Sequence, residues 1–544
     1  MQLAPTEELI HELTNLLKHS TVQSVNALRA TVAMSLSELV HRACIDETSS
    51  VYNYPVGIFG QFCSKDSKVI KKDLLPYLVE KLEEQKYQLQ QQHPTITAMN
   101  SALVYINALG NLGLEESSYA LLEVIEGKMT THPHPRSVAV YKLIRSARTN
   151  PSVYRPVILS IIQNIAENEE VRMAAISVLP YTLPSSADMQ KLAIRTWFES
   201  SQQVSSYITS TLKSLKGLPL QAPLYQKIAQ KAEEAYKLAK PMTTGIQTSH
   251  NIKIVQFLDT LRSAVTLKLQ YVTSEESAVP RTMYVKSDIQ SKSQSKDMFE
   301  SAVYVQGSEV LMEKMYNLYK IVQNQELPKY KQESILNIKN RMAKHPEAHV
   351  TLKMLGLQRF YSIDSEFIQG IVLQLTNEFI KDNQSNGIKK EFLKVLDLDG
   401  FNYIIPTESG LPLYVQQRTP MVISIHASLV MIKNGEAEIK IKPVFNYKQT
   451  THVGFFCPFT QKFLGAGVDT SVHVAAPLTA DVALQHGQLS ITLKTPDDAE
   501  SQKLKPVLAL RVMPYTNERD PIQETPEIKI IHTSYNGKHI LSLL

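Results

Sequence analysis

The side chains of this chain that could carry out chemistry do not form the pattern of a known active site. A zinc-protease helix needs a second histidine four residues after the first, and His11-Glu12 is not followed by one. His132 and His134 could touch a metal, but a third ligand is missing nearby and the neighbouring prolines predict a plain turn. No hydrolase nucleophile motif and no P-loop occurs either. We therefore predict no catalytic residue, no metal site and no cofactor, and we do not expect an enzyme.

Glycines and basic residues give equally little support for nucleotide or nucleic-acid binding. Gly465-Ala466-Gly467 is not flanked by a strand and a helix, as a dinucleotide-binding loop would be. The 57 lysines and arginines exceed the 52 acidic residues by a formal +5, but they are scattered rather than gathered with aromatic side chains. The densest basic group, Lys65 to Lys72, is typical of a solvated helix start. We expect no nucleic-acid partner.

The three cysteines, Cys44, Cys63 and Cys457, are too few for a disulfide-rich scaffold and lack the paired spacing of a zinc site. Cys44 ends a helical pattern and Cys63 follows a loop, so their spacing fits one local disulfide and, equally well, a reduced pair in the core. Asn383 begins a glycosylation sequon, which matters only if the chain is secreted. The first residues show no signal-peptide pattern, and no apolar run approaches ~18 residues.

The strongest pattern in the sequence is a one-sided β-hairpin. Between Met421 and Tyr447, apolar residues occupy every second position, and this period of two predicts strands. We predict a three-residue loop from Lys433 to Gly435, with Gly435 in the left-handed conformation. This loop gives apolar cross-strand pairs of Met431 with Ala437, Leu429 with Ile439 and Ile423 with Phe445. Its apolar face is on the order of 300 Å², which is close to the largest patch that a monomer exposes.

A second hairpin of the same kind follows it. Leu478, Ala480, Val482 and Leu484 are predicted to face Leu493, Ile491 and Leu489 across His486-Gly487. Two such sheets could pack against each other as a β-sandwich, or they could line a lipid-filled cavity, and periodicity alone does not separate these possibilities. The residues that would line the cavity are Ile423, Ile425, Leu429, Met431, Ile439, Ile441, Phe445, Val482, Leu484, Leu489 and Ile491.

The elements that precede these hairpins are of another type. From Pro5 to about Ala239, apolar residues recur with helical spacing in short segments separated by prolines. Successive short helices of this kind predict a helical solenoid. Trp197 shares a helical stripe with Leu192, so we expect it in the core.

Between the solenoid and the hairpins the pattern is mixed. Alternating residues predict strands at Val265 to Tyr271, at Met283 to Val285 and from His349 to Tyr361. A mobile loop or a strand edge is expected from Ser287 to Lys296, and helices are expected at residues 310–322, 330–342 and 366–380. At 544 residues, the chain is too long for one core. We predict an α+β fold with three domains, comprising residues 1–245, 246–400 and 401–544.

Four segments resemble the arthropod vitellogenins of the large lipid transfer protein family. They are Leu36 to Cys44, Tyr54 to Cys63, Tyr105 to Gly113, and Val453 to Phe459 with Gly465 to Val468. The resemblance implies a helical horseshoe followed by antiparallel β-sheets that line a lipid cavity, and a disulfide between Cys44 and Cys63. It favours the lipid-lined cavity over the dry sandwich.

The same resemblance implies a secreted yolk lipoprotein precursor, found in haemolymph and yolk, that carries phospholipid and neutral lipid and serves as a nutrient reserve. Such a protein would be glycosylated and could form homo-oligomers. The signal peptide and the N-terminal barrel of the family do not match any part of this sequence. We therefore expect a fragment of a longer chain, whose oocyte receptor would bind regions outside it.

A different class of protein remains as the alternative. An intracellular helical-repeat scaffold, such as a coat or adaptor subunit without lipid cargo, would also combine a solenoid with a β-rich appendage. The long one-sided strands after Phe401 favour the carrier, because an appendage does not need so much apolar surface.

Overall fold

The computed structural model describes residues 6–49, 63–91, 94–219 and 223–242, strand segments between 248 and 306, residues 347–354 and 357–363, and strand segments between 388 and 532. The chain divides into two compact units, Met1–Gly370 and Ile371–Leu544. The helices and a first sheet belong to the first unit, and a second sheet belongs to the other. The predicted α+β fold, with helices before antiparallel sheets, is confirmed.

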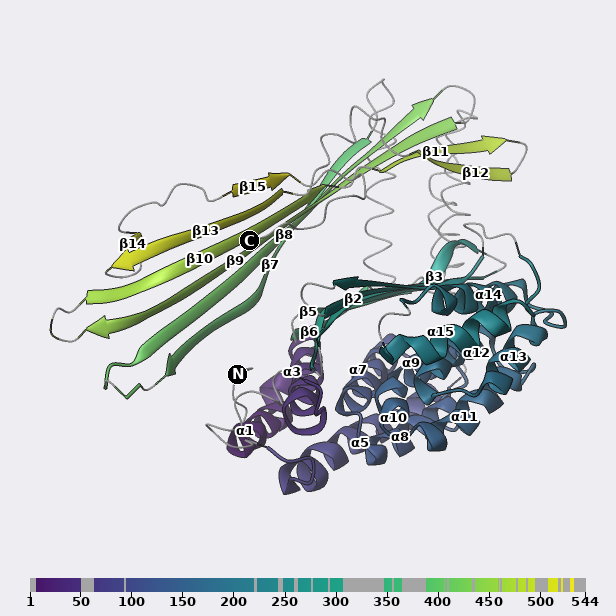
Figure 1. The fold of residues 1–544 in the computed structure, drawn as a ribbon, viewed down its shortest axis with the longest axis horizontal. Coiled ribbons are helices and arrows are strands. Elements are labelled where there is room, and N and C mark those ends of the chain that lie inside the picture. The colour runs from purple at the N-terminus through teal and green to yellow at the C-terminus, as the bar shows by residue number, and fades with distance from the viewer. Residues whose placement is uncertain are drawn as a thin grey trace, which may run out of the picture. The chain divides into compact units, whose positions relative to one another are not determined.

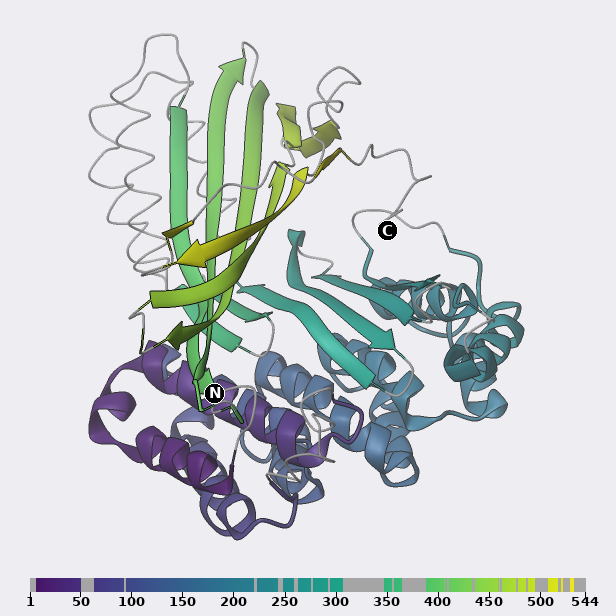
Figure 2. The same ribbon diagram turned by 60° about the vertical axis from the view of Figure 1, so that its left-hand side comes forward.

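The helices of the first unit form two layers (Figures 1 and 2). One layer consists of α3, α7, α9, α12 and α14, which pack one against the next, and the other helices flank it. The bounds are α1 (Glu7–Lys18), α2 (Ser20–Ser24), α3 (Asn26–Val40), η1 (His41–Ile45), η2 (Val69–Leu74), α5 (Leu75–Glu83), α6 (Lys86–Leu89), α7 (Ile96–Leu112), α8 (Glu115–Ile125), α9 (Pro133–Lys142), α10 (Ile144–Thr149), α11 (Pro151–Gln163), α12 (Glu169–Val178), η3 (Leu179–Thr182), α13 (Ser186–Arg195), α14 (Gln202–Lys216) and α15 (Pro223–Tyr236).

Local sequence signals explain where these helices begin and end. Ser185 and Asp188 form a reciprocal capping box at the start of α13. Pro133 and Pro151 each occupy the first turn of a helix, where a missing N–H has no cost. Gly113 ends α7 with φ of +67°, a left-handed conformation that glycine adopts without strain. None of the described helices combines the length and the hydropathy that a bilayer-spanning segment requires.

The first sheet, sheet A, is antiparallel and packs on the α3 to α14 layer. Its strands are β1 (His250–Leu258), β2 (Ser263–Ser274), β3 (Ser277–Ser291), β4 (Gln294–Gln306), β5 (Glu347–Met354) and β6 (Leu357–Ile363), in that order across the sheet. β1 contacts α14, and β6 contacts α3. The strands predicted around Leu267, Met283 and Val350 are therefore confirmed.

Of the two alternatives predicted for Ser287 to Lys296, the mobile loop is wrong, because β3 continues to Ser291 and β4 begins at Gln294, so most of the segment belongs to two paired strands. Directly beside this segment, Lys286 of β3 and Asp297 of β4 pair at 3.0 Å. The helices predicted between residues 310 and 380 lie outside the described residues.

The second sheet, sheet B, is built around two long strands. Its members are β7 (Ile388–Ile405), β8 (Leu413–Ile432), β9 (Glu436–Cys457), β10 (Lys462–Ala475), β11 (Leu478–Gln485), β12 (Gln488–Lys494), β13 (Val507–Thr516), β14 (Asp520–Pro521) and β15 (Lys529–His532). β9 pairs with β8 along one edge and with both β10 and β11 along the other, so the order is β12-β11-β9-β10-β13-β14 with β7-β8 beside β9. β7 begins at Ile388, before the strand-rich region expected from Phe401.

The predicted register of both hairpins is confirmed. Met431 pairs with Ala437, Leu429 with Ile439 and Ile423 with Phe445. Val482 pairs with Ile491, and Leu484 with Leu489. Three residues separate β8 from β9, as predicted, and the conformation of Gly435 lies outside the described residues.

Candidate functional site

The two faces of sheet A are inverted relative to an ordinary sheet that packs on helices. Along β2, the side chains that face the helices are Thr266, Lys268 and Gln270, which are 3%, 6% and 0% exposed. Gln270 donates to Ser177 Oγ of α12 at 2.6 Å, which fixes the direction of this face. The alternate residue Leu267 points the other way and is 43% exposed. In the middle of this strand, from Thr266 to Gln270, the polar side chains are therefore buried, and Leu267 between them is exposed.

The open side of sheet A continues across neighbouring strands. Ile254 pairs with Leu267, and Ile252 pairs with Leu269, so these residues share one face. Ile252, Ile254 and Met283 are 37%, 57% and 39% exposed. We define the apolar face of sheet A as Ile252, Ile254, Leu267, Leu269, Met283, Val285, Val350 and Leu352.

Sequence reasoning noticed the alternation in this region but assigned the lipid-facing wall to the later hairpins only. The signal that would have found the apolar face of sheet A is the same period of two that found the hairpins. Six strands ~4.8 Å apart, over three outward positions, make this face on the order of 300 Å². A patch of that size is comparable to the largest apolar patch on a typical monomer, which is often functional.

The buried side of sheet A carries a row of charged residues that crosses the strands. Each member lies directly opposite the next on the neighbouring strand. We call this set the charged row: Lys253, Lys268, Lys286, Glu300, Lys353 and Gln358. Charges buried in this way are stable only when opposite charges or polar groups surround them.

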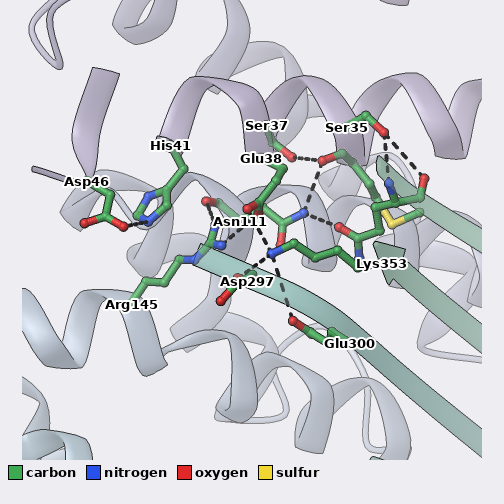
Figure 3. A network of polar contacts seen from close by, with 12 residues as sticks. Ser35, Ser37, Glu38, His41, Asp46, Asn111, Arg145, Asp297, Glu300 and Lys353 are labelled. Carbon is green, nitrogen blue, oxygen red and sulfur yellow. Dashed lines mark hydrogen bonds and ion pairs between the residues drawn. The ribbon is translucent and has the colours of Figure 1, made fainter. Parts of the chain in front are cut away.

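At the β5 end of the charged row, Glu38 of α3 provides the opposite charge (Figure 3). Its side chain is 1% exposed, and its Oε1 lies 2.9 Å from Lys353 Nζ. Its Oε2 accepts a hydrogen bond from Arg145 at 2.8 Å. Burial alone would raise the pKa of this carboxyl, but the charges of Arg145 and Lys353 hold it well below its usual range. Glu38 is therefore a buried carboxylate that joins helices to the sheet.

Asp297 and Glu300 complete the acidic half of this cluster. Asp297 lies 3.0 Å from both Lys353 and Lys286. Glu300 lies 3.9 Å from Lys142 of α9. Burial lowers the pKa of Lys142 to about 8, although the Glu300 carboxylate acts in the opposite direction. Each carboxylate thus bridges two elements, and the cluster holds α3, α9 and the sheet together.

Two of the segments that carry the resemblance supply side chains to this cluster. Asn111 of α7 donates to Gln358 Oε1 at 2.6 Å and to the Met34 carbonyl at 3.2 Å. Asn111 is labelled in Figure 3. His41 Nδ1 lies 2.7 Å from the Leu112 carbonyl. Burial, reinforced by the charge of Arg145, lowers the pKa of His41 to about 3, so it is neutral at physiological pH. These motif residues fasten helices to one another and to β6.

His132 and His134 do not form the predicted plain turn. His132 caps the start of α9, where its ring accepts from the His134 N–H at 3.3 Å. His134 is buried, and its ring stacks on Tyr304 of β4 with centroids 3.4 Å apart. Among the described residues, no group of three His, Cys, Asp or Glu side chains could hold a metal.

Cys44 and Cys63 are joined in a disulfide, as the resemblance implies. Cys44 lies at the end of the first helical segments in η1, and both residues are buried. Cys457 ends β9 and is half-buried. The sequon residue Asn383 lies outside the described residues.

Backbone register places the predicted cavity-lining residues on a single face of sheet B. The two predicted hairpins share this face because β11 pairs with β9, with Ala480 opposite Ile439 and Val482 opposite Ala437. The face therefore includes Ile423, Ile425, Leu429, Met431, Ile439, Ile441, Phe445, Val482, Leu484, Leu489 and Ile491.

The described side chains at the other end of β8 and β9 extend this face. Phe455 pairs with Leu413 on one side and Leu464 on the other. Val453, Phe455 and Leu464 are 37%, 39% and 50% exposed. Sheet B thus also presents an apolar surface that the described part of its own unit does not bury.

Comparison with known proteins gives the same description. Residues 3–213 match the vitellogenin TPR domain, and residues 247–504 match the vitellinogen open beta-sheet. Vitellogenin of Anthonomus grandis is 21% identical over 98% of this chain and 31% of its own length, and vitellogenin-1 of Solenopsis invicta is 24% identical over 92% and 30%. The chain therefore spans about three tenths of these relatives.

A more distant relative and a solved structure complete the comparison. The hemolymph clottable protein of Penaeus monodon is 25% identical over 49% of this chain and 15% of its own. A structure described as lipid-protein interactions in lipovitellin shares the fold, with a TM-score of 0.52 and 16% identity over 97% of this chain and 50% of that one. With a TPR domain followed by an open β-sheet, both of the vitellogenin type, this chain belongs to the vitellogenin family.

Proposed function

We propose that this chain is the lipid-carrying part of a yolk lipoprotein precursor, which holds acyl chains against the apolar faces of sheets A and B and acts as a carrier rather than a catalyst. The observation that supports this most directly is the inversion of sheet A. Its charged side faces the helices, and Ile254 and Leu267 on its apolar side are 57% and 43% exposed. Hydrocarbon is the partner that such a surface favours.

The inversion also argues against the scaffold alternative. A sheet that only braces a solenoid would gain most by burying Leu267 and Ile254 against the helices. Here the helices cover Lys268 and Lys353 instead, which costs desolvation of two ammonium groups. This desolvation cost is explained if the apolar side of the sheet must remain available for lipid.

We extend the proposal to the lipid-lining residues, the domain limits and the secretion that the sequence predicts. The eleven residues placed on one face of sheet B would line the lipid-binding surface. The same proposal includes domain limits at residues 245 and 400 and glycosylation at Asn383. It also includes secretion into haemolymph and yolk, formation of homo-oligomers, and uptake by an oocyte receptor that binds other parts of the precursor.

Lipid analysis of designed variants tests the role of sheet A. The full-length precursor would be produced in secreting insect cells and its bound lipid measured by extraction and native mass spectrometry. Ile254→Lys combined with Leu267→Lys should reduce bound lipid several-fold, because each ammonium group would face hydrocarbon. Ile165→Lys, at a helical-region position that is 71% exposed, is the matched control and should leave the lipid content unchanged. A lipid-free wild type, or equal loss in both variants, would refute the proposal.

Substitutions at Ile439 test sheet B. Fluid acyl chains reshape around a missing methylene, so Ile439→Ala should cost less than the ~2 to 5 kcal/mol of a packed core site. Ile439→Lys should be severe, because it buries an uncompensated charge. Denaturation and lipid content of both variants in the precursor provide the measurement. An alanine cost of 3 kcal/mol or more at this and neighbouring positions would show a dry, packed sheet.

A further inference from the structure

The charged row of sheet A is balanced at one end and unbalanced at the other. Lys253, Lys268 and Lys286 lie directly opposite one another on β1, β2 and β3. Like charges in directly opposite positions repel and destabilise a sheet. Lys286 is compensated by Asp297 at 3.0 Å. Lys253 and Lys268 have no carboxylate within 4 Å among the described residues, so two positive charges remain side by side.

A third cation, Arg148 of α10, joins these two lysines around one aromatic ring. The Arg148 guanidinium lies 4.6 Å from the centre of the Tyr181 ring, and the ammonium groups of Lys268 and Lys253 lie 5.5 and 5.9 Å from it. Lys253 also lies 4.6 Å from the ring of Tyr225 on α15. Arg148, like the lysines, has no described carboxylate partner. Three cations thus converge on the η3 residue Tyr181 from β1, β2 and α10.

Burial makes this arrangement costly unless something compensates it. Lys268 is only 6% exposed. Cation–π contacts with Tyr181 and Tyr284 are weak attractions that do not replace a full counter-charge. A bound anion would supply the missing counter-charge, because Arg and Lys side chains make strong charge-assisted hydrogen bonds to oxyanions.

We propose that Arg148, Lys253 and Lys268, with the Tyr181 hydroxyl, form a binding site for a phosphate-type oxyanion between the helices and sheet A. Arg148 is exposed and Tyr181 is half-buried, whereas Lys268 is deep, so the site is open to solvent at its α10 end. A doubly charged oxyanion with several acceptor oxygens matches two ammonium groups and one guanidinium group. The site lies on the side of the sheet opposite the apolar face, so it does not depend on the proposed lipid binding.

Without an anion, the Tyr181 phenol is the group that can offset these charges. Burial raises the pKa of this phenol, but the charges of Lys268, Lys253 and Arg148 outweigh that effect and lower its pKa to about 7. Binding of an oxyanion would neutralise the cations and raise the pKa of Tyr181 again. Tyrosinate absorbance near neutral pH is therefore a reporter of the site that does not depend on stability.

The test uses inorganic phosphate and the complete 544-residue chain at constant ionic strength. Phosphate should raise the melting temperature and reduce tyrosinate absorbance with the same concentration dependence. Arg148→Met, at an exposed position, should weaken phosphate binding at least tenfold, and Lys268→Met should abolish it. Lys268→Met should also melt higher than wild type when phosphate is absent, because it removes a buried unpaired charge. Lys216→Met is the matched control, since Lys216 lies 5.0 Å from the ring of Tyr236 rather than Tyr181, and it should bind phosphate as wild type does.

Two sources of the oxyanion are distinguished by competition. If a monomeric short-chain phosphatidic acid displaces phosphate, a lipid headgroup can occupy the site, and if it does not, the site takes free phosphate. Either result supports an oxyanion site. Absence of phosphate binding in wild type, or equal binding by wild type and the Arg148→Met and Lys268→Met variants, would overturn it.

Discussion

Replacing Glu38 by glutamine removes the central negative charge of the buried cluster while keeping the shape of the side chain. In the wild type, three carboxylates (Glu38, Asp297, Glu300) face four basic groups (Lys142, Arg145, Lys286, Lys353). After Glu38→Gln, Lys353 keeps Asp297 at 3.0 Å, whereas Arg145 keeps hydrogen-bond acceptors such as the Asn111 carbonyl but loses its carboxylate partner. The substitution therefore leaves one buried cation without an ion-pair partner.

Breaking a buried ion pair from one side costs ~3 to 5 kcal/mol. We expect the lower end, about 3 kcal/mol at pH 7, because Lys353 retains a second carboxylate. The cost should depend on pH. The folded-state pKa of Glu38 lies well below its ordinary value of 4.5, so this carboxylate stabilises the fold fully above that value and progressively less as the pH falls below it. The difference between wild type and Glu38→Gln should shrink correspondingly below pH ~4.5.

Hydrogen exchange measured by mass spectrometry on peptides of α3 gives the local opening free energy in the intact chain. Glu84→Gln is the control, because it removes a partner from the half-exposed Lys81–Glu84 pair at 2.6 Å, where a loss of at most ~1 kcal/mol is expected. If Glu38→Gln changed the opening free energy of α3 by less than 1 kcal/mol at pH 7, or by the same amount at pH 3 and pH 7, the buried cluster would not hold the helix to the sheet as described.

Two further predictions concern the packing of the helices. Cys63→Ser should lower the stability of the first helices by about 3 kcal/mol, because the disulfide closes a loop with a sequence separation of 19. Hydrogen exchange in α3 measures the effect, and an effect as small as that of Cys457→Ser would contradict it. Gly110→Ala should destabilise the α7–α9 contact by ~1 to 3 kcal/mol, since an added Cβ would lie 2.2 Å from the Lys142 Cβ. Gly217→Ala, whose Cβ would meet only ordinary contacts at 3.6 Å, is the thermal-melting control, and an equal melting temperature for the two variants would refute the packing argument.

Local patterns were sufficient for most of the described elements. Helical stripes and strand alternation depend on which side of an element is apolar, and a single sequence records that directly. The prediction that Trp197 lies in the core was wrong, because the helical stripe does not show where the helix ends. Its stripe continues that of Leu192, but α13 ends at Arg195, so Trp197 lies beyond the helix and is 55% exposed.

The buried cluster could not be predicted in the same way. Glu38, Arg145 and Lys353 lie far apart in the sequence, and each taken alone reads as a solvated surface residue. Their pairing depends on which strand of sheet A lies over which helix, which is a tertiary property. The segment from Ser287 to Lys296 is a related case, because its polar composition favours a loop, whereas pairing between β3 and β4 makes most of it strand.

The charged row has a consequence for how the strands of sheet A find their partners during folding. A shift of one residue in the pairing of any strand turns all its side chains to the opposite face. In an ordinary sheet with one buried face, such an error exposes the apolar residues of the strand to water. In sheet A, a shift of β2 would also remove Lys268 from its buried neighbours and place it among the apolar residues of the adjacent strands, such as Ile252 and Val285. The misaligned strand would then be unfavourable on both faces of the sheet, so the charged row favours a single register.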